Sequence, residues 1–209
     1  NKKESSMTTQ LARKITWNSS KQSFFTARLM VDTGLQDDCY RAYSYFRWAD
    51  DVIDDHCQTQ AERMVFIQRQ MRLVDGLCKA ESFADLSPEE KLIADLIDHE
   101  RDESCKLRSY IRNFLAILEF DAQRKGNLIS QQELEWYSDC LGVAVTDAIQ
   151  HFIGHKHPSP EDQSRFLAAT AAHIVHMLRD MQEDIQGGYI NIPREYLAEK
   201  GIAADDLQS

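Results

Sequence analysis

Residues 47–55 read Arg-Trp-Ala-Asp-Asp-Val-Ile-Asp-Asp, and this is the most informative stretch of the chain. It lies at the end of a helical pattern in which Asp50 and Asp54 stand four residues apart. In an α-helix this spacing places both carboxylates on one face, with Cβ atoms about 6 Å apart. Like charges so placed destabilise an isolated helix, so the pair predicts a compensating partner, for which a divalent cation is the usual candidate.

Residues 178–184 read Leu-Arg-Asp-Met-Gln-Glu-Asp and repeat the pattern, with Asp180 and Asp184 again four residues apart. Mg²⁺ prefers hard oxygen ligands and is usually held by one or two carboxylates together with substrate phosphates and water. Two facing helices that each carry one aspartate pair would therefore hold a cluster of Mg²⁺ and diphosphate.

Each acidic run could instead be a solvated helix end, and two observations favour a binding site. Arg47 and Arg179 stand beside the runs, and a guanidinium is well shaped to bind phosphate oxygens. Both runs also adjoin strongly apolar helical segments, 43–46 and 166–178, where unpaired carboxylates are not expected.

Residue patterns typical of helices occur along the whole chain. The 209 residues include only 8 Gly and 4 Pro, and apolar residues recur at spacings of three and four, which predicts an all-α protein. Capping boxes begin at Thr59, Ser87 and Ser130, and Ser159 with Pro160 indicates a further helix start. The predicted helices span 23–33, 37–56, 60–78, 88–104, 107–125, 131–157 and 160–186, with a bend at Gly142 and a short helix after Pro193.

Charge and cysteine content limit the partners and the compartment. The net charge is −10 and Lys and Arg form no run, which argues against a nucleic-acid surface. The five cysteines include no C-x-x-C pair, so a reduced cytoplasmic chain is the simplest interpretation. No apolar stretch reaches the ~18 to 20 residues of a membrane span, which leaves peripheral membrane contact open. The oligomeric state is not indicated.

With these motifs in this order, the chain resembles the squalene/phytoene synthase family over about residues 23–200. The segments that carry the resemblance are the Ser-Phe start at 23–29, the first aspartate motif at 40–55, the helix at 137–149 and the second aspartate motif at 178–193. The resemblance implies an isoprenoid-synthase-type helical bundle around a central apolar cavity. It also implies one domain over residues 1–209 that lacks the family's C-terminal helices.

The resemblance assigns roles residue by residue. Asp50, Asp54, Asp180 and Asp184 would bind Mg²⁺; Ser23, Arg47 and Arg179 would contact the diphosphates; Tyr43 would line the reaction site and Tyr137 the cavity wall. Asp121 would face the cavity by its place in the family pattern, or it is simply solvated.

Two departures from the family pattern stand out. His173 and His176 occupy positions where the family usually has Gln and Asn, and Tyr189 and Asn191 replace a basic residue and a Tyr. Both histidines share a helix face with Asp180, so we predict that they bind the diphosphate of the substrate. The alternative is that both are buried packing residues.

The reaction implied by the resemblance joins two farnesyl or geranylgeranyl diphosphates through a cyclopropyl diphosphate. Some members then reduce the intermediate with NADPH and others eliminate a proton, so the use of NADPH stays open. Metal ions and Arg stabilise the departing diphosphate, while an apolar cavity excludes water that would quench the cation.

Two other functions compete with this one. A class I terpene cyclase shares the metal chemistry but acts on one diphosphate. A non-catalytic assembly factor of the same fold would have no reason to keep both aspartate pairs and both arginines.

Overall fold

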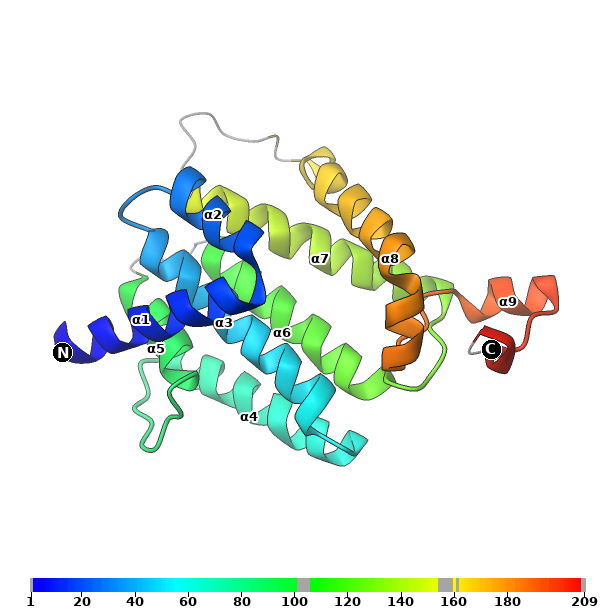
Figure 1. Cartoon of the computed structure of the whole chain (residues 1–209), viewed down its shortest axis with the longest axis horizontal. Coiled ribbons are helices and arrows are strands. Elements are labelled where there is room, and N and C mark those ends of the chain that lie inside the picture. Colours follow the sequence, from blue (N-terminus) through cyan, green and yellow to red (C-terminus); the bar gives the residue numbers. More distant parts are fainter. Residues whose placement is uncertain (1, 101–105, 154–159, 161, 208–209) are drawn as a thin grey trace.

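The computed structural model describes residues 2–100, 106–153, 160 and 162–207. This part of the chain contains helices and no strand, so the all-α prediction is confirmed (Figure 1). Its helices are α1 (Lys2–Ser19), α2 (Lys21–Met30), α3 (Gln36–Asp51), η1 (Val52–His56), α4 (Gln60–Cys78), α5 (Glu90–His99), α6 (Lys106–Arg124), α7 (Gln131–Phe152), η2 (Gln163–Phe166), α8 (Leu167–Gly187), α9 (Arg194–Lys200) and η3 (Ala204–Leu207). None of these helices is long and apolar enough to cross a membrane.

Helix α1 was not predicted. It packs along α3 through small residues, with Ala12 and Thr16 almost fully buried. The Ser44 hydroxyl donates to the Ala12 carbonyl oxygen at 2.7 Å, and the Thr16 and Ser44 hydroxyls are 3.0 Å apart. Such a face carries little hydrophobic periodicity, which explains why the sequence pattern did not reveal it.

The predicted helix starts marked by capping boxes agree with the structure more closely than the predicted helix ends. The three capping boxes are present, as in the pair formed by Ser87 and Glu90, whose side chains each accept the other's backbone N–H at 3.0 Å. Helices α5 and α7 end at His99 and Phe152, earlier than predicted, and residues 101–105 and 154–159 lie outside the described chain. Helix α8 begins seven residues later than predicted, because Asp162 caps a 3₁₀ turn first.

The arrangement places the two acidic stretches opposite each other. Helix α6 packs against both α4 and α7, α3 is covered by α1 and α5, and α8 lies on α7 (Figure 1). The core between them is apolar and aromatic, with residues such as Tyr45, Phe46, Ile67, Ile93 and Leu115 almost fully buried. The C-terminal end of α3 and the second half of α8 thereby face the C-terminal end of α6.

Gly142 marks a close approach of α7 to α8. A Cβ atom at this position would clash with the Thr170 Oγ1 atom of α8. The sequence predicted a bend at Gly142, whereas α7 continues through this residue, whose lack of a side chain lets α8 pack closely.

We expect Gly142→Ala to destabilise the fold by about 1–3 kcal/mol, because the added methyl group overpacks this contact. In a Thr170→Ala background the same change should be neutral or stabilising, since Ala is better than Gly in a helix by about 1 kcal/mol. Urea unfolding of the four proteins measures both effects. Gly34→Ala is the control, because its Cβ would meet nothing within 4 Å. Equal effects of Gly142→Ala in both backgrounds would show that this contact does not limit the packing.

Candidate functional site

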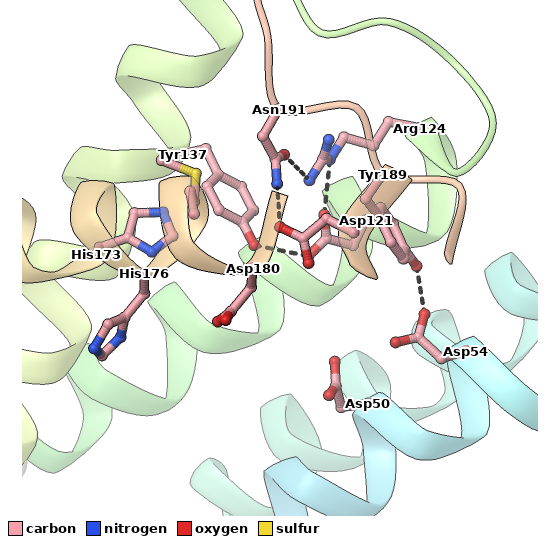
Figure 2. A pocket seen from close by; sticks show the side chains of 12 residues that line it. Asp50, Asp54, Asp121, Arg124, Tyr137, His173, His176, Asp180, Tyr189 and Asn191 are labelled. Carbon is pink, nitrogen blue, oxygen red and sulfur yellow. Dashed lines mark hydrogen bonds and ion pairs between the residues drawn. The ribbon is translucent and has the colours of Figure 1, made fainter. Parts of the chain in front are cut away.

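A polar cavity of about 260 Å³ lies where α3, α6, α7 and α8 meet (Figure 2). Its walls come from segments far apart in the sequence: the end of α3 and η1, the end of α6, the first half of α7, α8, and the connection from α8 to α9. The lining residues are Asp50, Asp54, Asp121, Arg124, Tyr137, His173, His176, Met177, Asp180, Asp184, Tyr189 and Asn191. Five of these are aspartates, so the cavity is strongly acidic.

The first aspartate pair lies on two kinds of helix. Asp50 is in the last turn of α3, whereas Asp54 is in the π-helical segment η1, which ends with a bond from the Cys57 N–H to the Val52 carbonyl oxygen at 3.0 Å. The sequence predicted one regular helix through residue 56. Short π-helical segments occur often at functional sites, and this one sets the position of Asp54 relative to Asp50.

Protein side chains hold Asp54 from outside its own helix. The Tyr189 hydroxyl donates to Asp54 Oδ1 at 2.6 Å, and Lys125 Nζ lies 3.2 Å from the same oxygen and 2.9 Å from the Asp54 carbonyl oxygen. The sequence predicted a positively charged partner for Asp50 and Asp54, and Lys125 is part of that partner.

Asp50 lacks such support. Burial in the cavity wall and the neighbouring Asp54 carboxylate raise the pKa of Asp50 from 3.8 to about 7, and Arg47, 3.6 Å away, offsets only part of this. A carboxylate that is costly to ionise without a partner is suited to a cation that arrives with the ligand.

The second aspartate pair comes from α8 and lines the same cavity, and Figure 2 shows Asp180 on the opposite side of it from Asp50. Asp184 accepts a hydrogen bond from Asn191 Nδ2 at 3.0 Å, and burial raises its pKa. Arg179 donates two hydrogen bonds to the Asp180 carboxylate, from Nε to Oδ1 and from Nη2 to Oδ2, each 2.6 Å long. These hydrogen bonds lower the pKa of Asp180.

Asp121 and Arg124 form one wall of the cavity. Arg124 Nε donates to Asp121 Oδ1 at 2.8 Å, and the Tyr137 hydroxyl donates to Asp121 Oδ2 at 3.1 Å (Figure 2). Burial raises the pKa of Asp121, and the Arg124 charge opposes this shift. The sequence left the position of Asp121 open, and the structure places it in the cavity.

Both histidines line the cavity, as does Tyr137. The His173 ring lies against Tyr137 with centroids 5.4 Å apart, and its buried Nε2 atom has no hydrogen-bond partner among the described residues. Burial lowers the pKa of His173 to about 4, so this imidazole is neutral near pH 7. The predicted contact of His173 and His176 with a diphosphate stays a prediction.

Four predicted site residues are not in the cavity wall. Arg47 and Arg179 are exposed, and each forms an ion pair, with Asp51 and Asp180 respectively. Tyr43 is half-buried on α3. Ser23 is in the first turn of α2, where its N–H donates to the Ser20 hydroxyl oxygen. Their contacts with a diphosphate stay predictions. Arg47 and Arg179 would reach it from the rim.

Sequence reasoning missed Arg124 and Lys125. The available signal was the spacing of Asp121 and Arg124, which are three residues apart on a predicted helix and therefore form a local pair. The contacts of Lys125 with Asp54 and of Arg124 with Asn191 join residues 71 and 67 positions apart, which spacing does not reveal.

The donor set fits Mg²⁺ as part of a larger cluster. Among the described residues, no three His, Cys, Asp or Glu side chains lie close enough together to hold a metal ion alone. Mg²⁺ takes few protein carboxylates and completes its octahedron with phosphate oxygens and water. Asp50 with Asp54, and Asp180 with Asp184, would be the carboxylates.

An apolar groove of about 710 Å³ adjoins the cavity and shares Met177 and Asn191 with it. Its other walls come from α7, α8 and the start of α9 and include Leu134, Ile174, Leu178, Met181, Ile192 and Tyr196. An acidic cavity and an apolar groove thus lie side by side.

We expect Asp50→Asn to raise the melting temperature of the metal-free protein at pH 8 by about 1–3 °C. The gain is small because the Asp50 side chain is 44% exposed and water screens part of its charge. The pKa of Asp50 is higher in the folded chain than the ordinary 3.8, so folding is opposed when this group must ionise. That cost is present in full above about pH 7 and is lost as the pH falls toward about 4, so the gain should disappear on acidification. Thermal unfolding in EDTA at both pH values measures it. Asp51→Asn, outside the cavity, is the control, and an equal gain at both pH values would contradict the argument.

Comparisons with known proteins agree with the fold. The family model described as squalene/phytoene synthase matches residues 18–209. A bifunctional lycopene cyclase/phytoene synthase of Leptosphaeria maculans is 25% identical over 203 residues, which cover 89% of this chain and 34% of that protein. Presqualene diphosphate synthase of Zymomonas mobilis subsp. mobilis is 24% identical over 186 residues, covering 88% of this chain and 60% of that protein. The chain thus spans about a third to three fifths of the length of these relatives.

Proposed function

We propose that this chain, which belongs to the squalene/phytoene synthase family, catalyses the Mg²⁺-dependent head-to-head (1′-1) condensation of two prenyl diphosphates. The observation that carries the proposal is that two aspartate pairs, 126 or more residues apart in the sequence, line one cavity. Arg124, Lys125 and Arg179 offset part of the negative charge of these carboxylates. Asp50 keeps a raised pKa, so the cavity still favours a ligand that brings positive charge. A diphosphate with Mg²⁺ does so and uses the oxygen ligands present.

The apolar groove beside the cavity supports a ligand that has an apolar chain attached to its anionic head. Farnesyl and geranylgeranyl diphosphates have this form. Relatives named phytoene synthase and presqualene diphosphate synthase support the same substrate class. The product would be of the squalene or phytoene type, formed through a cyclopropyl diphosphate, with NADPH needed only for a reductive second step.

Chemistry in the cavity would begin with cleavage of the allylic carbon–oxygen bond. Bound Mg²⁺ supplies the positive charge that stabilises the departing diphosphate. Asp50, Asp54, Asp180 and Asp184 would hold the Mg²⁺ to which the anionic head binds. The ring of Tyr137 would give the cationic carbon an aromatic neighbour on the cavity wall. A neutral His173 has an unpaired Nε2 and can donate a hydrogen bond to a phosphate oxygen in the appropriate tautomer.

Release of pyrophosphate tests this function. The protein is incubated with farnesyl or geranylgeranyl diphosphate, with Mg²⁺ or EDTA, and with or without NADPH. We expect release only with Mg²⁺, at two pyrophosphates per hydrocarbon when the reaction completes. One pyrophosphate per cyclised monomer would identify a terpene cyclase, and no release with either substrate would identify a non-catalytic relative.

A further inference from the structure

We propose that Arg124 is a positioning residue that sets both aspartate pairs at once, through Asn191 to Asp184 and through Tyr189 to Asp54. The inference rests on the proposed function for its ligand, Mg²⁺ with a diphosphate. It assigns a role to three residues, Arg124, Tyr189 and Asn191, that lie together on one side of the cavity (Figure 2).

The branch to the second pair is a chain of two hydrogen bonds. Arg124 Nη2 donates to Asn191 Oδ1 at 2.9 Å, and Asn191 Nδ2 donates to Asp184 Oδ2 at 3.0 Å. A guanidinium offers only donors and a carboxylate offers only acceptors, so the Asn191 amide has one orientation that satisfies both. Arg124 therefore fixes the direction from which Asp184 is held.

The branch to the first pair runs through an aromatic ring. The Arg124 guanidinium carbon lies 5.1 Å from the centre of the Tyr189 ring, and the Tyr189 hydroxyl donates to Asp54 Oδ1 at 2.6 Å. The same guanidinium is 5.2 Å from the Tyr137 ring and 5.3 Å from the Phe120 ring. Stacking among three rings restrains the guanidinium, and through it the Tyr189 ring that reaches Asp54.

The environment of Arg124 is not that of a simple packing residue. Its side chain is only 7% exposed, yet the Nη1 atom has no hydrogen-bond partner among the described residues. A buried donor without a partner costs stability, and a side chain chosen only for packing would avoid that cost. Groups that orient metal ligands from behind typically change metal affinity by about 10- to 100-fold when they are replaced.

The test measures binding of Mg²⁺ in the presence of saturating pyrophosphate by titration calorimetry, which requires no turnover. We expect Arg124→Gln to raise the half-saturating Mg²⁺ concentration about 10- to 100-fold. Asn191→Ala and Tyr189→Phe, which each remove one branch, should each raise it by less. Added to Arg124→Gln, neither change should raise it much further, because all three act along the same path.

Two further variants separate positioning from folding. Arg124→Lys keeps the charge beside Asp121 but loses the planar fork, so its melting temperature should stay near that of the parent while the Mg²⁺ requirement rises. If Arg124→Gln does not fold, the Mg²⁺ requirement of Arg124→Lys is measured in its place. Arg63→Gln is the matched control, because Arg63 is also 7% exposed and donates to the Ala122 carbonyl oxygen without lining the cavity. It should leave Mg²⁺ binding unchanged.

The proposal is overturned if the Arg124 variants lower the melting temperature without changing the Mg²⁺ requirement, or if Asn191→Ala and Tyr189→Phe both bind Mg²⁺ like the parent protein. It is also overturned if the parent binds no Mg²⁺ with pyrophosphate. A parent whose Mg²⁺ binding depends on Arg124 but that turns over no prenyl diphosphate would support the positioning role and refute the proposed reaction. Turnover of a prenyl diphosphate with a Mg²⁺ requirement that does not depend on Arg124 would support the proposed reaction and refute the positioning role.

Discussion

Asp180→Asn and Asp50→Asn should each lower kcat/KM for a prenyl diphosphate by about 10³-fold or more, while the helical fold is retained. Each change removes a charged oxygen ligand of the proposed Mg²⁺ from one side of the cavity. The Mg²⁺ that neutralises the diphosphate would then be held by the other pair only. The loss should appear in kcat as well as in KM, because charge on the leaving group is greatest in the transition state.

Steady-state assays at saturating Mg²⁺, with circular dichroism on the same samples, measure this effect. Matched controls come from the same helices: Asp51→Asn on α3 and Glu183→Gln on α8 change neighbouring acidic residues that do not line the cavity. They should keep activity within a few-fold of the parent protein. Activity of the parent level in either Asp180→Asn or Asp50→Asn would contradict the metal-binding role of that pair.

Mg²⁺ and pyrophosphate together should raise the melting temperature by about 10 °C when both are near 1,000 times their coupled dissociation constants. Either one alone should have little effect. Pyrophosphate alone meets five aspartates, and Mg²⁺ alone finds two carboxylates on each side and no phosphate. Each ligand therefore provides what the other lacks, so their binding is coupled.

Differential scanning calorimetry with each ligand, both and neither measures the coupling as the excess over the sum of the single shifts. Asp184→Asn should remove most of that excess, and Glu183→Gln should keep it. Strictly additive shifts in the parent protein would show that the metal and the diphosphate bind at separate places.

Local signals in the sequence predicted much of the helical structure. Helix α4 spans residues 60–78 as predicted, because a capping box at Thr59 marks its start and an apolar stripe follows it. Helix α1 was missed because its buried face is made of Ala and Thr. The late start of α8 was missed because the Asp162 cap closes a 3₁₀ turn before the helix begins.

The acidic half of the candidate site could be predicted for the same reason. The spacing of Asp50 and Asp54 is a local feature, and so is that of Asp180 and Asp184. The groups that hold them are not local: Tyr189 lies 135 residues from Asp54 along the chain, and Lys125 lies 71 residues from it. Only the packing of α6 and of the α8–α9 connection around the cavity brings these side chains together.

The most direct test of the central claim is the isotope pattern of the product. The protein with Mg²⁺ is given an equal mixture of unlabelled and fully deuterated farnesyl diphosphate, and in a parallel reaction the geranylgeranyl pair, each with and without NADPH. Mass spectrometry of the product should show unlabelled, half-labelled and fully labelled species near 1:2:1, because two substrate molecules are joined in each product. A product that contains only unlabelled and fully labelled species would come from one diphosphate and would contradict the account.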